Sequence, residues 1–555
     1  MPAEQRERFP QLHEIVVQVL YNRQFLSVED VQKFMAQDAP LHDPFSLKGM
    51  DAAVTRIERA IRNGERIAVY GDFDADGVTS TALLTQTLRA LGAIVAPYIP
   101  DRVDEGYGLN TDALDNLSAR GADLIITVDC GIRSSDEVAY GNALGLDIIV
   151  TDHHSVGPEL PPALAVINPK QPGCEYPFRD LAGVGLAFKL AQALMKSFSS
   201  TTLRPEHLLD LVALGTVADI VPLRGENRSL VQRGLEQLNA PWRKGLLALM
   251  SKSGVRAGYV DSTAIGFMLG PRINAAGRLQ NAMLAYDLLM TADSTKAARY
   301  ADQLSQLNQQ RQNLTREATE LARSQVIDES GEAPYLLFAA SADFLAGIVG
   351  LVGSRLTEEF YRPSVVVERG EEESRASCRS IPEFHITHAL DECADLLLRY
   401  GGHAAAAGFS LRNENLPALQ ERLEAIARQK LEKVDLHPTL KIDAELSLGP
   451  QLYDLYEQLE SLQPFGEANP APVFITRGLR VGRRQTVGAE GHHLKFSVSD
   501  GQAWWDAIAF RRGQDADQLP DRVDLAYQLD MNEWNGRKRL QMIVRDWRAA
   551  SQRRS

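Results

Sequence analysis

The stretch Gly71-Asp72-Phe73-Asp74-Ala75-Asp76-Gly77 follows directly after the apolar run Ile67-Ala68-Val69-Tyr70. A run of four β-prone residues that ends in alternating aspartates is typical of a buried strand whose carboxyl end carries acidic side chains. Carboxylates crowded this closely repel one another unless a cation neutralises them, and hard divalent metals prefer oxygen ligands. The stretch therefore predicts a metal site, although an isolated Asp-x-Asp-x-Asp is more often an acidic turn.

Two later apolar runs end in residues of the same kind. Residues 124–128 lead into Asp129-Cys130-Gly131, and residues 148–151 lead into Asp152-His153-His154. Helical stretches separate these runs, which predicts βαβ units in a parallel sheet with ligands beyond the carboxyl ends of its strands. Asp129 alone could simply cap a helix, and the histidine pair could lie solvated in a loop. Their recurrence at matching strand ends favours one shared site.

Asp219 is a fourth candidate, because it lies toward the end of the segment 215–222, which is otherwise apolar and helical. A carboxylate in such surroundings is rarely buried unless it is paired or bound to a cation.

The length of 555 residues predicts three or four domains with ample cores. The amino-terminal residues are polar and mixed in charge, unlike a signal peptide, and no apolar run is long enough to span a membrane. The four cysteines are scattered and form no Cys-x-x-Cys pair. We therefore expect a reducing cytoplasm, and neither a structural zinc site nor a disulfide framework.

The net charge of −14 at first argues against a nucleic-acid partner, but the charge is unevenly distributed. From Arg477 to the end there are 15 Lys+Arg against 10 Asp+Glu, a difference of +5, and four of the five tryptophans lie in the same region, at positions 504, 505, 534 and 547. A basic, aromatic module attached to an acidic body predicts a nucleic-acid-binding domain.

Periodicity divides the chain into five parts. Residues 1–55 form an amphipathic helical segment, 56–290 a parallel-sheet α/β domain, and 291–328 one long helix without Pro or Gly, which leads to a second α/β domain at 329–434. Two lobes joined in this way would form a cleft. Residues 435–555 predict an OB-fold β-barrel, with strands at 440–445, 473–475, 494–498, 507–510 and 540–544. There we expect at least one of Trp504 and Trp505 to be buried, because they point to opposite faces of a strand.

Several motifs together resemble the DHH phosphoesterase superfamily and, within it, the bacterial RecJ family of single-strand-specific DNA exonucleases. They cover the chain from about residue 50 onward: Gly71–Gly77, Val128-Asp129-Cys130-Gly131, Thr151-Asp152-His153-His154, Gly215-Thr216-Val217-Ala218-Asp219, Glu105-Gly106-Tyr107-Gly108-Leu109-Asn110, Gly270-Pro271-Arg272-Ile273-Asn274-Ala275-Ala276-Gly277-Arg278 and Gly401-Gly402-His403. Two positions depart from the family pattern. The segment 343–347 lacks a usual histidine, and Ala468 stands where glycine is usual.

The chemistry that these residues support is hydrolysis with two divalent cations, Mn²⁺ or Mg²⁺. Asp74 and Asp76 would lean toward different metals and Asp129 would bridge them. The resemblance adds His153 and Asp219 at the second metal, and Asp72 either as a ligand of the first metal or behind it. The expected metal ligands are thus Asp72, Asp74, Asp76, Asp129, His153 and Asp219, and the expected catalytic residues are His154, Asp129, Asp74 and Asp76.

Ser377 and Arg379 lie two residues apart on one side of an extended run, where a hydroxyl and a guanidinium can hold a phosphate, unless the run is an ordinary exposed strand. The resemblance implies that they anchor a terminal 5′ phosphate together with Arg102 and Arg278. We also expect the substrate to contact Tyr107, Asn308, Arg311 and His403. In the OB-fold, basic residues interleaved with tryptophans suit phosphate neutralisation and base stacking, so we expect contacts from Arg483, Arg484, Lys495, Trp534, Arg537 and Lys538.

The resemblance implies 5′→3′ hydrolysis of single-stranded DNA in recombination and repair. It further implies a cytoplasmic monomer that acts with a helicase and a single-strand-binding protein. Two alternatives stay open from the sequence. One is a non-catalytic DNA-binding replication scaffold of the same lineage, and the other is a small-molecule phosphodiesterase or pyrophosphatase built on the DHH core.

Overall fold

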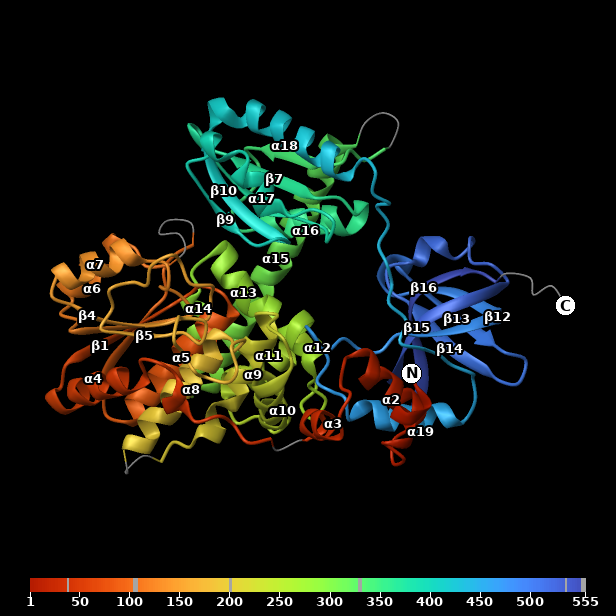
Figure 1. The fold of residues 1–555 in the computed structure, drawn as a ribbon, viewed down its shortest axis with the longest axis horizontal. Coiled ribbons are helices and arrows are strands. Elements are labelled where there is room, and N and C mark those ends of the chain that lie inside the picture. The colour runs from red at the N-terminus through yellow and green to blue at the C-terminus, as the bar shows by residue number, and fades with distance from the viewer. Residues whose placement is uncertain (37–38, 103–107, 199–201, 328–331, 535–536, 551–555) are drawn as a thin grey trace. The chain divides into compact units, whose positions relative to one another are not determined.

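The computed structural model describes residues 1–36, 39–102, 108–198, 202–327, 332–534 and 537–550. The chain forms two compact units. The larger comprises His42–Val221 and Arg233–Pro438, and the smaller comprises Met1–Leu41, Pro222–Gln232 and Thr439–Ser555. Figure 1 labels their helices and strands.

A five-stranded parallel sheet with the order β2-β1-β3-β4-β5 organises the larger unit. All five residues of β3 and five of the six in β1 are buried, which is typical of a parallel sheet covered on both faces. This confirms the predicted α/β core. Its strands are β1 (Arg66–Gly71), β2 (Ile94–Tyr98), β3 (Leu124–Val128), β4 (Asp147–Thr151) and β5 (Ala165–Ile167).

Two sets of helices pack on these strands. Helices α6 (Thr111–Ala119) and α7 (Ser135–Ala143) bury Leu114, Leu117 and Val138 against alternate residues of β1, β3 and β4. Helices α5 (Ala75–Ala90) and α8 (Gly183–Ser197) also contact the sheet and each other. The chain enters α5 directly from the carboxyl end of β1, so the aspartate stretch forms the connecting turn.

The rest of this half of the unit is helical. Its helices are α4 (Met50–Asn63), α9 (Leu209–Ala218), α11 (Lys244–Ser253), α12 (Ser262–Ala264), α13 (Gly270–Leu279) and α14 (Met283–Met290). Helix α10 (Gly225–Asn239) is shared, because its residues up to Gln232 belong to the smaller unit. The predicted long helix is α15 (Ser294–Val326), 33 residues or about 50 Å in length, which Asp293 caps at its amino end.

The second lobe carries a sheet of order β6-β7-β8-β10-β9, in which only β6 and β7 are parallel. Helices α15 and α16 (Val349–Phe360) enclose one of its cores, and α17 (Ile386–Asp391) and α18 (Leu416–Leu431) enclose the other. The strands are β6 (Leu337–Ser341), β7 (Ser364–Arg369), β8 (Glu373–Arg379), β9 (Arg399–Gly402) and β10 (Ala406–Arg412).

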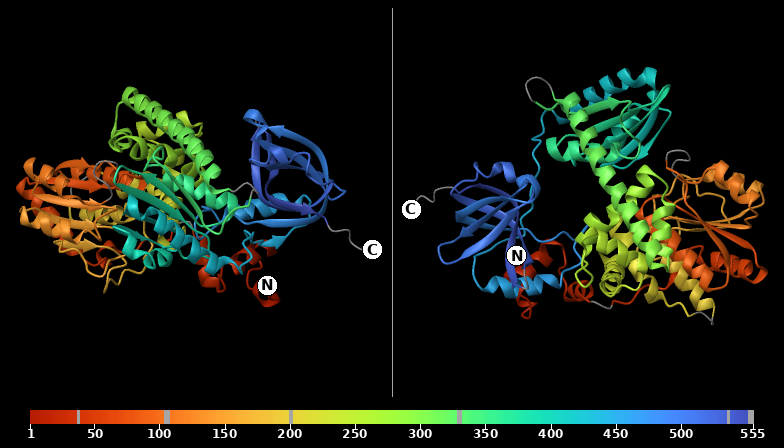
Figure 2. Two further views of the ribbon diagram at one scale, coloured as in Figure 1. Left: turned by 90° about the horizontal axis from the view of Figure 1, so that it is seen from above. Right: turned by 180° about the vertical axis from the view of Figure 1, so that it is seen from behind.

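The smaller unit contains a closed five-stranded barrel, because β12 pairs with both β13 and β15 (Figure 2). Its strands are β12 (Phe474–Val487), β13 (His493–Ser499), β14 (Trp504–Ala509), β15 (Arg522–Trp534) and β16 (Arg537–Ala549). The OB-like barrel is confirmed, but two details of the prediction are wrong. Residues 440–445 supply only the two-residue edge strand β11 (Ala444–Glu445), and β15 was missed.

The amino-terminal helices α1 (Ala3–Glu7), α2 (Glu14–Asn22) and α3 (Val28–Met35) share a core with the barrel and with α19 (Gln451–Glu460). Arg228 links the same parts, since its guanidinium donates to the carbonyl oxygens of Phe34 at 2.9 Å, Leu462 at 2.9 Å and Ser461 at 3.2 Å. The amino-terminal segment therefore forms part of the barrel's packing.

Neither tryptophan of the pair at the start of β14 is buried, contrary to the prediction. Trp504 is 59% exposed, and Trp505 is half-buried against the barrel core, with its ring centroid 6.2 Å from that of Tyr453. Among the described residues, no helix is both long and apolar enough to cross a membrane.

Candidate metal centre and phosphate site

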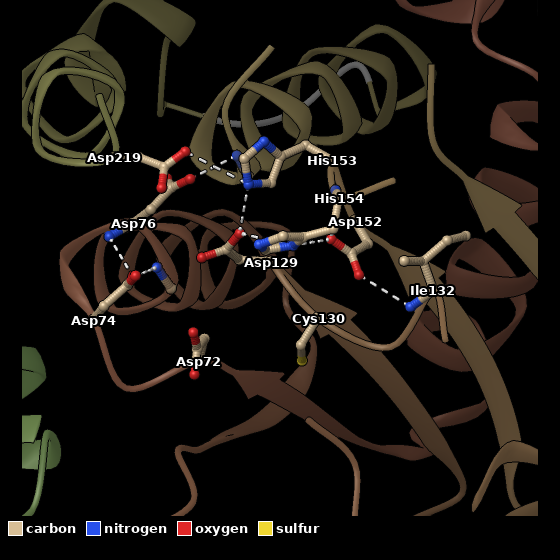
Figure 3. Close-up of polar contacts among 12 residues, drawn as sticks. Asp72, Asp74, Asp76, Asp129, Cys130, Ile132, Asp152, His153, His154 and Asp219 are labelled. Carbon is tan, nitrogen blue, oxygen red and sulfur yellow. Dashed lines mark hydrogen bonds and ion pairs between the residues drawn. The ribbon is translucent and has the colours of Figure 1, made fainter. Parts of the chain in front are cut away.

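The aspartate stretch forms the turn between β1 and α5 (Figure 3). Asp74 is the amino-terminal cap of α5, and its Oδ1 accepts hydrogen bonds from the backbone N–H groups of Asp76 at 2.9 Å and Gly77 at 3.0 Å. Asp72 is buried and accepts from the Phe73 N–H at 2.7 Å. The local structure thus places the three carboxylates at one end of the sheet.

Asp76 is held by a second helix. Its two oxygens accept hydrogen bonds from the backbone N–H groups of Gly183, at 2.7 Å, and Val184, at 2.8 Å, which open α8. The amino end of a helix stabilises negative charge, so this contact suits a buried carboxylate. Gly183 also lets α8 approach the site, because a Cβ at this position would lie 2.6 Å from the Cβ of Asp129.

Asp129 adopts a left-handed backbone conformation, with φ +63°, which aspartate tolerates better than most residues. Its Oδ1 lies 3.1 Å from Nε2 of His153 and 4.0 Å from Nδ1 of His154. Both Asp129 Oδ1 and His153 Nε2 are buried, and neither has a hydrogen-bond partner among the described residues. Buried polar atoms are rarely left unpaired, so these two atoms fit a cation between them.

The predicted ligands come together in three groups, within each of which the ligand atoms lie within 4.8 Å of one another. They are Asp72, Asp74 and Asp129; Asp76, His153 and Asp219; and Asp129, His153 and His154. The first two groups have no member in common, and Asp129 lies against His153 of the second. Carboxylate oxygens with one imidazole nitrogen form a donor set that suits Mn²⁺ or Mg²⁺, so the residues fit two cations.

The electrostatics of these carboxylates also favour a cation. Burial, reinforced by the charge of Asp74, raises the pKa of Asp76 to about 7 and that of Asp72 well above its usual range. Burial and the neighbouring carboxylates raise the pKa values of Asp129 and Asp219 in the same way. A divalent cation would relieve this repulsion and restore the ionised forms.

The two adjacent histidines have opposite properties. Burial, together with the charge of His154, lowers the pKa of His153 to about 3, which leaves this imidazole neutral and able to ligate a metal. Burial also opposes the charged form of His154, but the hydrogen bond and charge of Asp152 outweigh it and raise the pKa. His154 is therefore the member of the pair that carries a positive charge.

Asp152 is a candidate functional residue to which the sequence analysis gave no role. It is buried, its Oδ1 lies 2.7 Å from Nδ1 of His154, and its Oδ2 accepts from the Ile132 N–H at 2.9 Å. The charge of His154 keeps the pKa of Asp152 low despite burial. Its place directly before a histidine pair at a strand end was the available signal, since such a carboxylate can orient an imidazole.

Arg278 belongs to a cluster of four arginines with Arg102, Arg311 and Arg379, and both Arg278 and Arg102 sense the charge of Asp74. Burial, with the nearby charges of Arg102, Arg311 and Arg379, lowers the pKa of Arg278 to about 10. Arg102 lies over the ring of Phe73, with Cζ 4.8 Å from the ring centroid, and senses the charges of Asp72 and Asp74. Crowded, partly desolvated guanidinium groups repel one another unless an anion is present.

The second lobe supplies the other phosphate-binding candidates. Arg379 donates to the Ser377 hydroxyl at 2.9 Å and to the Ser354 hydroxyl at 3.1 Å, so strand β8 presents Ser377 and Arg379 together, as their spacing predicted. Arg278 of α13 donates to the carbonyl of Gly347 at 2.9 Å. This bond joins the second lobe to α13, whose Asn274 accepts from the Ala75 N–H of the aspartate turn at 2.7 Å.

The remaining predicted substrate residues have different surroundings. Asn308 is buried, and its side-chain oxygen accepts from Arg311 at 2.8 Å, so it holds this arginine in place. His403 is exposed beside the cavity next to His154. Tyr107 lies outside the described residues.

The barrel residues are only partly available for nucleic acid. Arg483 and Lys538 are exposed, whereas Arg484 pairs with Asp521 at 2.5 Å and Lys495 lies 3.7 Å from Asp506. Such surface pairs are weak and can exchange for phosphate. The side chains of Trp534 and Arg537 lie outside the described part of the chain.

The two departures from the family pattern have structural counterparts. Ala468 has φ +57°, a conformation that explains why glycine is usual there, and its carbonyl accepts from Arg224 at 2.7 Å. Phe344 is buried in the core around α16, and Leu345 is 44% exposed. Ala468 is therefore accommodated in a turn, and Phe344 contributes to packing.

Comparisons with known proteins agree with this architecture. Residues 66–216 match the DHH family N-terminal domain, 333–429 the DHHA1 domain and 442–546 the RecJ OB domain. The chain is 40% identical over 547 residues to the single-stranded-DNA-specific exonuclease RecJ of Bacillus subtilis, covering 97% of this chain and 68% of that protein. It is 37% identical to the protein of the same name from Escherichia coli, with 90% of each chain covered.

Solved structures show the same likeness. The crystal structure of RecJ in complex with Mn²⁺ from Thermus thermophilus superposes with a TM-score of 0.85 at 33% identity, over 99% of this chain and 78% of that one. The Mg²⁺ complex from the same organism gives a TM-score of 0.79 at 32% identity, over 99% and 77% of the two chains. With its three domain types matched in order and its relatives aligned over most of their length, the chain belongs to the RecJ family.

Proposed function

We propose that this protein hydrolyses single-stranded DNA from its 5′ end, releasing nucleotides with the help of two divalent cations, Mn²⁺ or Mg²⁺. The observation that carries the proposal is the set of ligand groups around Asp129 Oδ1 and His153 Nε2, two buried atoms that make no hydrogen bond, with Arg102 and Arg278 close enough to sense the carboxylates. The names of the relatives, single-stranded-DNA-specific exonucleases, support the substrate.

In this proposal Asp72, Asp74 and Asp129 hold one cation, and Asp76, His153 and Asp219 hold the other, with Asp129 positioned between them. When bound, the cations would lower the pKa of a water molecule and offset charge on the phosphodiester. His154 directs a positively charged imidazole at the scissile phosphate, because Asp152 keeps its Nδ1 hydrogen-bonded and its pKa raised.

The arginine cluster gives the proposed reaction its direction. A terminal 5′ phosphate carries more charge than an internal phosphodiester, and guanidinium groups recognise it by charge-assisted hydrogen bonds. Arg102, Arg278 and Arg379 with Ser377 would hold this terminus beside the metal ligands, so that the chain is cut near its 5′ end.

Cleavage of end-labelled oligonucleotides tests the proposal. Purified protein with Mn²⁺, Mg²⁺ or chelator is given 5′- and 3′-labelled single- and double-stranded DNA. We expect metal-dependent release of mononucleotides from the 5′ end of single strands alone. Metal-independent cleavage or attack from the 3′ end would contradict the proposal, and metal-dependent DNA binding without cleavage would favour a non-catalytic scaffold.

Asp129→Asn and His154→Ala connect this activity to the site. Both should reduce cleavage by several orders of magnitude, because each removes a group placed against the reacting phosphate or its cations, while the far-UV circular dichroism stays that of the wild type. Asn suits position 129 better than Ala, because it tolerates a positive φ. Substantial residual activity in either variant would refute the assigned role.

The biological setting belongs to the same proposal. We infer action in recombination and repair, as a cytoplasmic monomer that works with a helicase and a single-strand-binding protein. All four cysteines are free and buried, in keeping with a reducing compartment.

The domain boundaries at 55, 290, 328 and 434 are likewise proposed; α4 continues across residue 55.

A further inference from the structure

A cavity of about 480 Å³ opens next to His154, on the side where Asp152 and Ile132 lie. The loop after β3 and the start of α7 supply Ile132, Arg133, Ser134 and Glu137 to its wall, and the second lobe supplies Gly402 and His403. This volume is in the range of pockets that hold a small organic group. Of the wall residues just named, only His403 has a role in the metal and phosphate contacts described above.

The wall carries charges of both signs, because Arg133 and His154 line it together with Glu137 and Asp152. Glu137 lines the cavity and is half-buried, and its carboxylate has no hydrogen-bond or ion-pair partner among the described residues. Asp152 also lines the cavity, but its two oxygens are occupied by His154 and the Ile132 N–H. An unpaired carboxylate repels an anion and accepts hydrogen bonds from N–H groups.

The other wall groups suit a flat, polar ring. The Ser134 hydroxyl makes no bond to the helix that it precedes. Arg133 uses Nε to bind the carbonyl of Ser155, at 2.9 Å, which leaves its terminal nitrogens for a further acceptor. Gly131 also lines the cavity, and its φ of +104° is a backbone conformation that favours glycine.

We propose that this cavity, called here the Glu137 cavity, binds the base of one of the two nucleotides that flank the scissile phosphate. The proposal rests on the proposed function and goes beyond it, since it assigns a contact with the base where the other predicted contacts of this unit are with metals and phosphates. Glu137 accepts from a ring or exocyclic N–H, and Arg133 and Ser134 donate to ring nitrogen or carbonyl oxygen. Every DNA base presents at least one such N–H, so the cavity accepts all four.

Substrates with a single missing base test the proposal without altering the phosphates. The purified full-length protein with Mn²⁺ is given 5′-phosphorylated single strands that carry an abasic residue at nucleotide 1, at nucleotide 2, or at neither, and the first cleavage is followed under single-turnover conditions. We expect the abasic residue to slow wild-type cleavage about tenfold at one of the two positions, the size of one charge-assisted hydrogen bond. The affected position shows which nucleotide enters the cavity.

Glu137→Ala separates a contact with the base from a general loss of activity. It should slow cleavage of the intact strand about tenfold and leave cleavage of the affected abasic strand unchanged, while Glu137→Gln should keep part of the discrimination. Asp136→Ala is the matched control, because Asp136 is exposed in the same helical turn and does not line the cavity.

The outcomes keep the two proposals apart. Equal rates of wild type on intact and abasic strands, or equal losses of Glu137→Ala on both, would overturn the base-binding role while the exonuclease proposal stands. Absence of metal-dependent cleavage of any strand by the wild type would overturn the proposed function, and with it this inference.

Discussion

At the scale of single residues, two adjacent histidines of one motif have different protonation states and therefore different proposed roles. His153 and His154 are adjacent, yet burial keeps the first neutral and Asp152 keeps the second charged. A metal ligand needs a free lone pair and a phosphate contact needs a positive charge, so opposite pKa shifts suit the two roles.

Asp152→Asn should change the pH dependence of the reaction. Asn can still accept from the Ile132 N–H. Once the carboxylate charge is gone, however, the effect of burial is no longer outweighed and the pKa of His154 falls. The imidazolium is then lost as pH rises through that lower value. We expect kcat/KM at pH 8 to fall by roughly 10–100-fold, the usual effect of removing such a partner, with partial recovery near pH 6. A loss of equal size across the pH profile would contradict this role.

Arg379→Ala should discriminate between substrates by their 5′ end. The guanidinium is bonded to Ser377 and belongs to the arginine cluster, so its removal should weaken a contact with the terminal phosphate. We expect roughly tenfold or greater loss of kcat/KM on 5′-phosphorylated strands and a much smaller loss on 5′-hydroxyl strands. Equal losses on both substrates would contradict the anchor role. Arg483→Ala serves as the control, because Arg483 is an exposed arginine of the barrel.

At the scale of secondary structure, the site depends on helices that approach one another closely at a glycine. Helices α5, α8 and α9 pack together behind the metal ligands. A Cβ on Gly215 of α9 would lie 2.3 Å from Thr79 Oγ1 and 2.9 Å from Asp76 Oδ1. Glycine at this position therefore lets α9 bring Asp219 to the same site as Asp76.

Gly215→Ala should damage metal binding and stability together. The added methyl has no room, and overpacking of a core typically costs about 1–3 kcal/mol, or several degrees in Tm for a domain of roughly 200 residues. We expect a lower Tm and weaker Mn²⁺ affinity, measured by calorimetry. Gly266→Ala is the control, because a Cβ there meets no atom within 4 Å. A Gly215→Ala protein with wild-type Tm and affinity would be inconsistent with this packing.

The strand β15 shows what element-level prediction missed. Val523, Leu525 and Tyr527 are fully buried and alternate with Asp524 and Ala526, so a period-two signal was present in the sequence. Leu529 and Met531 continue the alternation, but the residues between them include Asp530 and Asn532, types that are depleted in strands and weaken the signal. Pairing with both β12 and β16 makes it a strand, and this depends on residues far away in the chain.

At the scale of the whole molecule, the metal-free site is electrostatically unfavourable. The pKa of Asp76 is about 7 in the folded protein, against 3.8 for an ordinary aspartate, so between these values the folded chain binds a proton that the unfolded chain has released. The contribution of Asp76 to stability therefore falls as pH rises from about 4 to about 7. His153, with its lowered pKa, acts in the opposite direction.

A comparison of wild type with Asp76→Asn isolates this effect. In chelator, the Tm of wild type minus that of Asp76→Asn should decrease by several degrees as pH rises from 4.5 to 7.5, because only the wild type ionises at this position. Saturating Mn²⁺ should raise the Tm of the wild type at pH 7.5 more than that of the variant. A difference that stays constant with pH would show that Asp76 is not destabilised by burial.

The sequence by itself determined the parallel sheet, the long helix, the second lobe and the presence of a barrel, because hydrophobic periodicity and strand-end residues are local signals. It also identified the six candidate metal ligands, which recur at strand and helix ends. Only the tertiary structure decided that Asp152 orients His154, that Asp129 adopts a positive φ and that four arginines from separate segments meet. It alone placed a cavity beside His154, since distances and burial arise from packing between segments far apart in the chain.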